Sequence, residues 1–201
     1  MSQATLAEKV FGPGLTADTP VAIGIDQSLT GFALTVISVD DPTKYKTFVY
    51  KSPYNGVQRL SDISGWLVGK LVDASTLSKN KVQDVAIEGS VLTSFSALVL
   101  GELAATVKLA IWELFKGGPL HLRTPLQIPP MTLKKYAAGK GNAKKQEMLL
   151  QIYKRYGIEF NDDNAADSYA LARIAAGLAL GEIEAQIIEQ IKDAKYRDVV
   201  K

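Results

Sequence analysis

The chain has 201 residues, no cysteine and one histidine, and 47% of its residues are hydrophobic and 22% charged. This composition is ordinary for a single globular domain that buries about 70% of its unfolded surface. It excludes disulfides and thiolate metal sites. No apolar run approaches the ~20 residues of a membrane helix. We therefore expect a cytoplasmic protein with no membrane partner.

The formal net charge of +2 is unevenly distributed. Residues 129–156 contain seven basic residues and one acidic residue, a net charge of +6, which leaves −4 for the rest of the chain. A basic segment on a slightly acidic body indicates a polyanionic partner, although a solvated helix face has the same composition. Its lysines include Lys134, Lys135, Lys140, Lys144 and Lys145.

The first half of the chain is expected to hold an arm, four strands and a helix. Residues 1–19 contain a Gly-Pro-Gly sequence and are predicted to form an irregular arm before a domain over residues 20–181. Leucine and isoleucine recur at helical spacing between residues 57 and 77, which predicts an amphipathic helix. Turn sequences separate the predicted strands, which are Val21–Asp26, Phe32–Val39, Lys46–Lys51 and Val82–Glu88.

The second half is expected to be mainly helical. A short fifth strand is predicted at Leu120–Arg123, which makes the single histidine, His121, a strand residue. Three strands followed by alternating helices and strands predict an α/β fold, a mixed five-stranded sheet with helices on both faces. The predicted helices are Ser94–Phe115, about 129–138, Lys144–Tyr156 and Asn164–Leu180, followed by a C-terminal helical extension over residues 182–201.

Two of the predicted strands end in a carboxylate, Asp26 and Glu88, and a third acid, Asp167, lies near the start of the alanine-rich helix. Side chains alternate along a strand, so Asp26 shares its face with Ala22 and Gly24. That face is small enough for a helix to approach the sheet closely. At 100° per residue, Asp167 lies at the end of its helix's own apolar stripe and is expected to face the sheet.

Ionised carboxylates at the ends of buried strands are costly unless a cation offsets them. Mg²⁺ prefers oxygen ligands, and Mn²⁺ is expected to substitute for it. We expect two ions about 3.5–4 Å apart, with Asp26 as the shared ligand between Glu88 and Asp167, a pattern that favours metal-assisted phosphodiester hydrolysis. Each acid also has a purely structural alternative. Asp26 could form an Asx turn, Glu88 could be an exposed strand end, and Asp167 could complement the dipole at the start of its helix.

The order and spacing of four motifs over about residues 21–180 resemble the ribonuclease H-like nuclease fold. Within it, the chain is most similar to the RuvC family of Holliday junction resolvases, in a compact form like that of phage-encoded members. The similar segments are Gly24-Ile25-Asp26 with Thr30-Gly31, Ala86-Ile87-Glu88, the basic stretch from Lys134 to Lys145, and Ala165-Ala166-Asp167.

The resemblance implies a Mg²⁺-dependent crossover junction endodeoxyribonuclease, and its basic stretch implies that lysines contact the DNA and that Lys145 assists catalysis. Where the family usually has an acid three residues before the last one, this chain has Asn164, preceded by Asp163. Either residue is an expected metal ligand, and either also suits a helix N-cap. Phe95 is the aromatic residue nearest to the position where the family often contacts DNA with an aromatic side chain.

A homodimer is expected because a four-way junction has two-fold symmetry and paired cuts need two active sites. A flap or debranching nuclease on the same fold is the main alternative, and a non-catalytic junction-binding protein is a weaker one. An actin-like kinase is excluded because 201 residues leave no room for its second domain. The expected dimer contacts lie on the apolar helix Ser94–Phe115, at Ala97, Gly101, Ala104, Ala105 and Lys108.

Overall fold

The computed structural model describes residues 7, 9–12, 14–89 and 97–197. At its centre is a mixed five-stranded sheet in the order β3-β2-β1-β4-β5. The β3–β2 and β2–β1 pairs are antiparallel, whereas the β1–β4 and β4–β5 pairs are parallel. The predicted α/β architecture is confirmed. The strands are β1 (Val21–Asp26), β2 (Phe32–Ser38), β3 (Tyr45–Tyr50), β4 (Val82–Glu88) and β5 (Leu126–Ile128).

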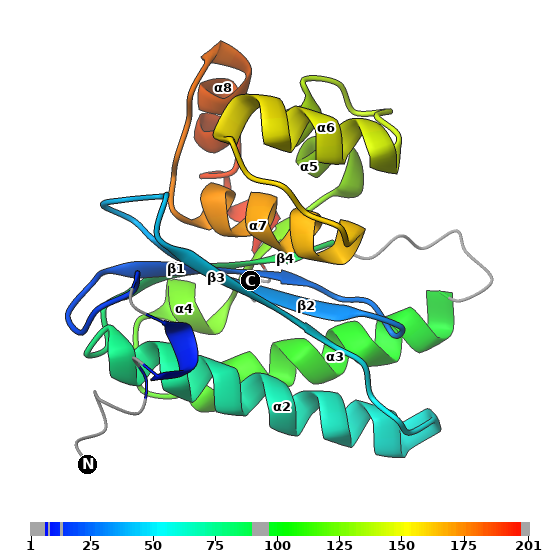
Figure 1. The fold of residues 1–201 in the computed structure, drawn as a ribbon. Coiled ribbons are helices and arrows are strands. Elements are labelled where there is room, and N and C mark those ends of the chain that lie inside the picture. Colours follow the sequence, from blue (N-terminus) through cyan, green and yellow to red (C-terminus); the bar gives the residue numbers. More distant parts are fainter. Residues whose placement is uncertain (1–6, 8, 13, 90–96, 198–201) are drawn as a thin grey trace.

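Helices cover both faces of the sheet (Figure 1). On one face α7 lies directly on the strands, with α5, α6 and α8 beyond it, and on the other face lie α2, α3 and α4. No helix among the described residues is long and apolar enough to cross a membrane. The helices are α2 (Gly56–Leu77), α3 (Ala97–Leu114), α4 (Leu120–Arg123), α5 (Pro130–Ala138), α6 (Lys145–Tyr156), α7 (Asp163–Ala175), α8 (Glu182–Gln190) and the 3₁₀ helix η1 (Ala194–Tyr196).

The alternation of side chains along β1 and β4 divides the core into two layers. Ala22 and Ala86 pack in the α7 layer, whereas Ile23 and Val85 pack in the layer of α2 and α3. On the α7 side, a methyl group at Gly24 would overlap backbone atoms of α7. The small face predicted for β1 is therefore what lets α7 lie against the sheet.

The predicted fifth strand is wrong in position. Leu120–Arg123 forms the short helix α4, and His121 is an exposed helix residue. Pro119 favours this first turn because its fixed φ suits a helix start, and the Leu122 amide donates to its carbonyl at 3.1 Å. The strand follows Pro125 instead, where Leu126–Ile128 pairs with the end of β4.

The segment expected to be an irregular arm contributes to the core. The described residues from 7 to 11 are helical, and Ala7, Phe11 and Leu15 are buried beneath the sheet. The Phe11 ring contacts the Phe48 ring of β3 edge-on, with 5.5 Å between the centroids. The buried residues are spaced by four, which is typical of one face of a helix. This spacing predicts the structure of the segment better than its Gly-Pro-Gly sequence does.

Three further expectations need correction. Helix α7 ends at Ala175, before the predicted Leu180, because Gly177 turns the chain with a positive φ of 67°. The C-terminal extension is divided into α8 and η1, both of which contribute buried residues to the α7 layer. In α3, Ala104 is buried on the inward stripe of Leu103, Val107 and Ile111, so it cannot serve as a dimer contact.

Candidate active site

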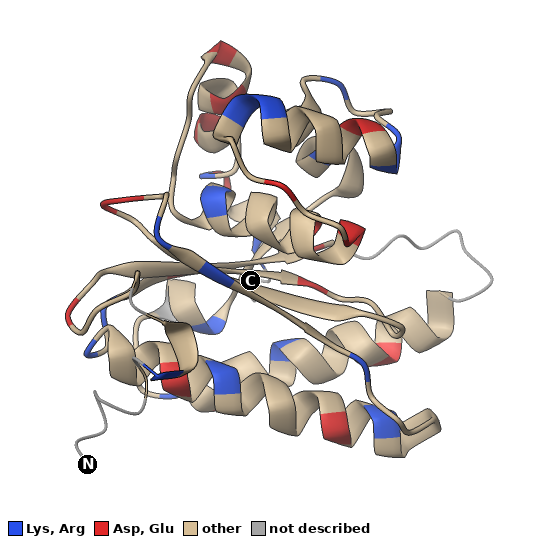
Figure 2. Cartoon of the chain, in the orientation of Figure 1, with Lys and Arg blue, Asp and Glu red and all other residues tan. Residues whose placement is uncertain are grey.

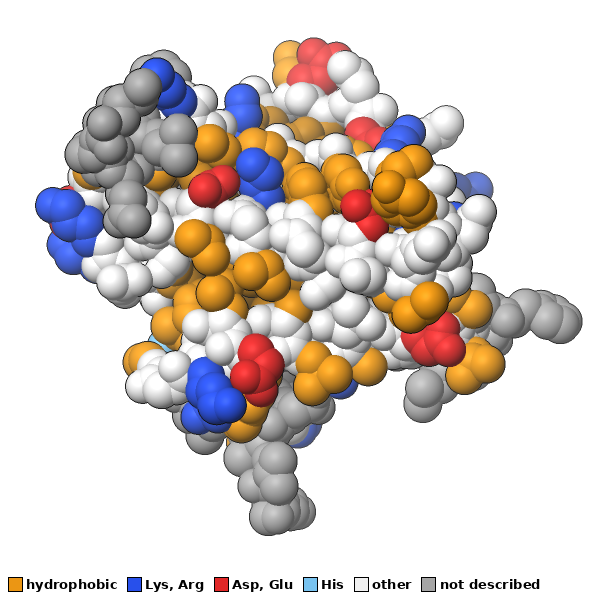
Figure 3. Space-filling view, turned by 90° about the horizontal axis from the view of Figure 1, so that it is seen from below, with side chains coloured by type: hydrophobic (Ala, Val, Ile, Leu, Met, Phe, Trp, Pro, Cys, Tyr) orange, Lys and Arg blue, Asp and Glu red, His pale blue; other side chains and the backbone are white. Residues whose placement is uncertain are grey.

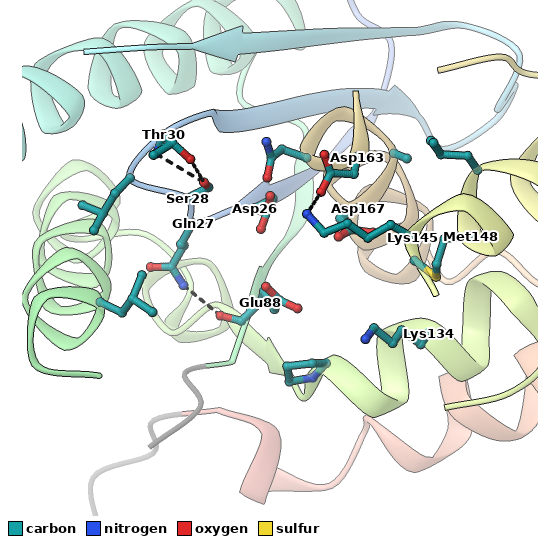
Figure 4. A pocket seen from close by; sticks show the side chains of 16 residues that line it. Asp26, Gln27, Ser28, Thr30, Glu88, Lys134, Lys145, Met148, Asp163 and Asp167 are labelled. Atoms are coloured by element: carbon teal, nitrogen blue, oxygen red, sulfur yellow. Dashed lines mark hydrogen bonds and ion pairs between the residues drawn. The ribbon is translucent and has the colours of Figure 1, made fainter. Parts of the chain in front are cut away.

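Asp26 and Glu88 lie side by side at one edge of the sheet (Figure 4). Each is the last residue of its strand, and the two strands are parallel neighbours in which Ile25 pairs with Ile87. Asp26 is 4% exposed, and its carboxyl group lies close enough to that of Glu88 for the Glu88 charge to raise the pKa of Asp26. Parallel pairing thus produces the convergence that the sequence predicted for these two acids.

Helix α7 adds Asp167 from above the sheet. Its N-cap is Asp162, whose Oδ1 accepts a hydrogen bond from the Ala165 amide at 3.0 Å. Because Asp162 caps the helix, neither Asp163 nor Asn164 is needed for that role, and both side chains line the same pocket as Asp167. The capping alternative considered for these two residues is therefore excluded.

The acids share a pocket of about 390 Å³ with the β1–β2 turn and the first residues of α5 and α6. In Figure 4 the Asp26, Glu88 and Asp167 carboxyl groups point toward the same open space, with Lys134 and Lys145 at its border. The lining residues are Asp26, Gln27, Ser28, Leu29, Thr30, Glu88, Leu100, Pro130, Lys134, Lys145, Met148, Leu149, Asp163, Asn164, Ala166 and Asp167.

The environment disfavours the ionised state of the three principal acids. Burial, followed by the charge of Glu88, raises the pKa of Asp26 well above its ordinary value. Burial also raises the pKa of Glu88, against the opposing hydrogen bond from Asp26. The pKa of Asp167 is raised to about 7 by burial and then by the charges of Glu88 and Asp163. Clustered, buried carboxyl groups of this kind are typical of functional sites.

Two lysines bring positive charge to the pocket. Lys145, the first residue of α6, forms an ion pair with Asp163, which lowers the pKa of Asp163 and raises that of Lys145. The charges of Lys134 and Lys145 also oppose the rise in the pKa values of Glu88 and Asp167. Asp163 therefore reaches the pocket as an ionised carboxylate that already has a cationic partner.

The donor set fits a hard divalent cation. The acids and the Asn164 amide supply oxygen ligands, which Mg²⁺ and Mn²⁺ prefer, and a cation would relieve the repulsion that raises the pKa of Asp26 and Asp167. As the described side chains lie, no three acidic or histidine groups are arranged to hold an ion. Asp163 is paired with Lys145, so coordination by Asp163 requires its carboxylate to exchange this partner for the ion.

A chain of buried hydroxyl groups fixes α7 to the sheet beside Asp167. Thr35 Oγ1 of β2 lies 2.8 Å from Ser168 Oγ and 2.7 Å from Thr47 Oγ1 of β3. Ser168 Oγ is also 2.9 Å from the Ala165 carbonyl oxygen, to which it donates. Hydrogen bonds in a buried environment have directional requirements that set the rotation of the helix as well as its depth.

Gln27 is a pocket residue that the sequence interpretation treated only as part of a turn. Its side-chain amide donates to the Glu88 carbonyl oxygen at 2.8 Å and joins the ends of β1 and β4. The side chain follows Asp26 directly but its partner is 61 residues away in sequence. Local sequence patterns carry no signal for such a contact.

The remaining predicted DNA-binding residues are placed around the pocket to different extents. Lys134 lines it, whereas Lys135 and Lys144 are exposed on the neighbouring surface. Lys140 is paired with Glu147 at 2.7 Å, which offsets its charge. Phe95 lies outside the described residues.

The strand order, the acid-bearing strand ends and the helix that carries the third acid define a ribonuclease H-like fold. Solved structures confirm the expected RuvC-like form of this fold. Thermus thermophilus RuvC is 23% identical, with a TM-score of 0.54, over 78% of this chain and 92% of that chain. The T. thermophilus RuvC structure in complex with Holliday junction substrate is 24% identical, with a TM-score of 0.57 and the same coverage.

A third similar structure is the yeast mitochondrial Holliday junction resolvase Ydc2, with 14% identity and a TM-score of 0.53. The similarity covers 94% of this chain and 86% of Ydc2. No family model matches the chain, and no curated protein sequence does. At these identities the similarity establishes the fold, and function is argued from the site.

Proposed function

We propose that the protein is a structure-selective endodeoxyribonuclease that resolves four-way DNA junctions in the cytoplasm by metal-dependent phosphodiester hydrolysis. The observation that carries the proposal is the convergence of Asp26, Glu88 and Asp167 in one pocket. The fold supports it, because RuvC shares this fold and one RuvC structure contains a Holliday junction substrate. A protein that only binds junctions would have no use for three buried acids whose ionised forms are disfavoured.

Asp26, Glu88 and Asp167, with Asp163 or Asn164, would hold Mg²⁺ or Mn²⁺, and two ions per site suit this number of ligands. The chemistry that such ions would supply when bound is activation of a water molecule and stabilisation of charge on the phosphate and the leaving oxygen. The protein's own contribution is to hold the carboxylates on rigid strand ends and a docked helix. Lys145 supplies positive charge at the border of the pocket, where charge develops on the phosphate.

The lysines around the pocket provide the DNA-binding surface of the proposal. Lys134 lines the acid pocket from the middle of α5, Lys135 follows it in the last turn of that helix, and Lys144 is the N-cap residue of α6. Figure 2 shows the basic residues of these two helices in blue. Cations that border a site for a scissile phosphate hold the neighbouring phosphates and add a salt-dependent share of the binding energy. Branched DNA therefore fits both the charge and the position of this surface.

A homodimer would supply the two active sites that paired cuts require. The outer face of α3 carries a stripe of exposed apolar residues, with Leu98 77% and Leu109 63% exposed and Ala105 between them. Figure 3 shows hydrophobic side chains gathered on this side of the molecule. We propose that α3 packs against its twin through this stripe, with Ala97, Gly101 and Lys108 beside it.

Cleavage of a synthetic four-way junction, compared with a flap, a fork and a linear duplex, tests the proposal. A resolvase cuts the junction preferentially and places its cuts symmetrically on opposed strands. A cruciform plasmid tests coupling, because paired cuts in one encounter linearise the plasmid and independent cuts leave nicked circles. Preference for the flap, with nicked circles and a monomeric mass by sedimentation, would establish the debranching nuclease instead.

A further inference from the structure

A second basic surface borders the edge of the sheet that carries the acids. Residues 51–62 contain two basic residues, Lys51 and Arg59, and one acidic residue, Asp62, whose carboxylate accepts the Tyr50 hydroxyl. Lys51 is exposed directly after β3. Arg59 donates through Nε to the Tyr54 carbonyl oxygen at 2.8 Å, a neutral acceptor that leaves its charge in place. Among the described residues, none forms an ion pair with Lys51 or Arg59.

Strand register places this surface near the acids. Ala33 of β2 pairs with both Asp26 of β1 and Val49 of β3. Two strand spacings therefore separate Val49 from Asp26, about 10 Å. Residues 51–55, which we call the β3–α2 loop, follow the end of β3 and extend past the position of Val49. The lysines of α5 and α6 lie on the other side of the sheet, so Lys51 and Arg59 place positive charge on the opposite side of the acids from these lysines (Figure 1). Acidic residues of α2 and α3 lie on the same side as Lys51 and Arg59 (Figure 2).

The β3–α2 loop is held in place at both ends. The Tyr50 ring stacks on the Trp66 ring of α2, with 5.0 Å between the centroids, and its hydroxyl donates to Asp62 at 2.8 Å. At the other end, Arg59 Nη2 donates to Asn55 Oδ1 at 2.5 Å. The side chain of Tyr54, between these anchors, is 49% exposed. An aromatic ring presented on an anchored loop loses little conformational entropy when it binds.

We propose that the β3–α2 loop, together with Arg59, is a second DNA-contact surface. Lys51 and Arg59 contact the phosphate backbone of one arm, and Tyr54 stacks on a base whose face is exposed where the arms separate at the branch point. Base–aromatic stacking tolerates any sequence because every base has a π-face. This inference rests on the proposed function, since it requires branched DNA to be bound at the acid pocket.

Fluorescence anisotropy in EDTA measures binding without cleavage, using a labelled four-way junction and a linear duplex of the same sequence. Lys51→Gln should reduce the slope of log affinity against log salt by about 0.9 on both DNAs, and Lys51→Arg should restore it. Tyr54→Ser should weaken junction binding at least about five-fold and leave duplex binding unchanged. Tyr54→Phe should bind as the parent does.

Lys79→Gln is the matched control. Lys79 lies just beyond the other end of α2, about 30 Å from Arg59 along the helix, and it pairs with Asp18. It should leave both affinities and the salt slope unchanged. If Lys51→Gln and Tyr54→Ser also bind the junction as the parent does, the second surface is wrong and the proposed function stands. If the parent itself does not bind branched DNA, both proposals are wrong.

Discussion

Gly24 of β1 and Ser168 of α7 meet backbone to backbone, so closely that a β-carbon at Gly24 would lie 2.1 Å from the Ser168 carbonyl oxygen and 2.2 Å from the Ala172 amide nitrogen. Gly24→Ala should therefore push α7 away from the sheet and separate Asp167 from Asp26. We expect a loss of about 1–3 kcal/mol in the free energy of unfolding and a strong loss of cleavage. Chemical denaturation and a junction-cleavage assay measure the two effects.

Gly65→Ala is the control for this substitution. Gly65 lies within α2, and a β-carbon there would meet no atom within 4 Å. Alanine should stabilise the helix by about 0.5–1 kcal/mol and leave cleavage unchanged. A Gly24→Ala protein as stable and active as Gly65→Ala would show that the close contact does not position the acids.

Asp26→Asn should lower the cleavage rate by at least about 100-fold while junction binding is retained or becomes tighter. The substitution removes the proposed shared metal ligand, whose loss costs several kcal/mol of transition-state stabilisation, and it removes a negative charge near the phosphates. Asp84→Asn is the control, because Asp84 shares a strand with Glu88 but pairs with Arg197. Full activity of Asp26→Asn in Mg²⁺ would contradict the nuclease assignment.

Without divalent metal, the protein should lose stability as pH rises from about 4 to about 7. The pKa of Asp167 is about 7 in the folded state, against 3.8 as its ordinary value. Between these values the folded chain holds a proton that the unfolded chain has released, so raising the pH favours unfolding. Thermal melts in EDTA should show Asp167→Asn gaining stability relative to the parent across this range, and Mg²⁺ should reduce the difference. A difference independent of pH would contradict the assigned pKa.

Substitution of three consecutive residues identifies the fourth metal ligand. We expect Asp163→Ala or Asn164→Ala to shift metal binding, measured by calorimetry with Mn²⁺, to higher metal concentrations. Asp162→Ala is the control, because it removes the helix cap and should cost about 1 kcal/mol of stability without changing metal affinity. Parent-like binding by both other variants would mean that the site uses three protein ligands.

Neutralising Lys134 and Lys144 together should weaken junction binding and reduce the salt slope by about 0.9 for each phosphate that the variant no longer binds. Lys140→Gln should have a smaller effect, because Glu147 already offsets its charge at 2.7 Å. Anisotropy titrations from low to physiological salt measure both slopes. A Lys144→Gln variant whose salt slope falls no more than that of Lys140→Gln would indicate general electrostatic attraction in place of specific phosphate binding.

The sequence predicted that Asp26 and Glu88 lie together at the ends of two strands, because the alternation of side chains along a strand fixes the face on which each acid lies. It also predicted the close approach of α7, since small residues accompany Asp26. It misplaced the fifth strand because Leu120–Arg123 alternates apolar and basic residues, as a strand does, while four residues are also enough for one helical turn. The Gln27 contact and the Asp162 cap depend on tertiary geometry and on a choice among adjacent polar residues, which local patterns do not resolve.

The three acids come from β1, β4 and α7, so they meet only after most of the chain has folded. During synthesis Asp167 is the last of them to leave the ribosome, and the hydroxyl chain that orients α7 also needs β2 and β3 in place. A nascent chain therefore has no complete catalytic pocket. In the proposed nuclease, this order of the elements along the chain would delay cleavage of DNA until the fold is complete.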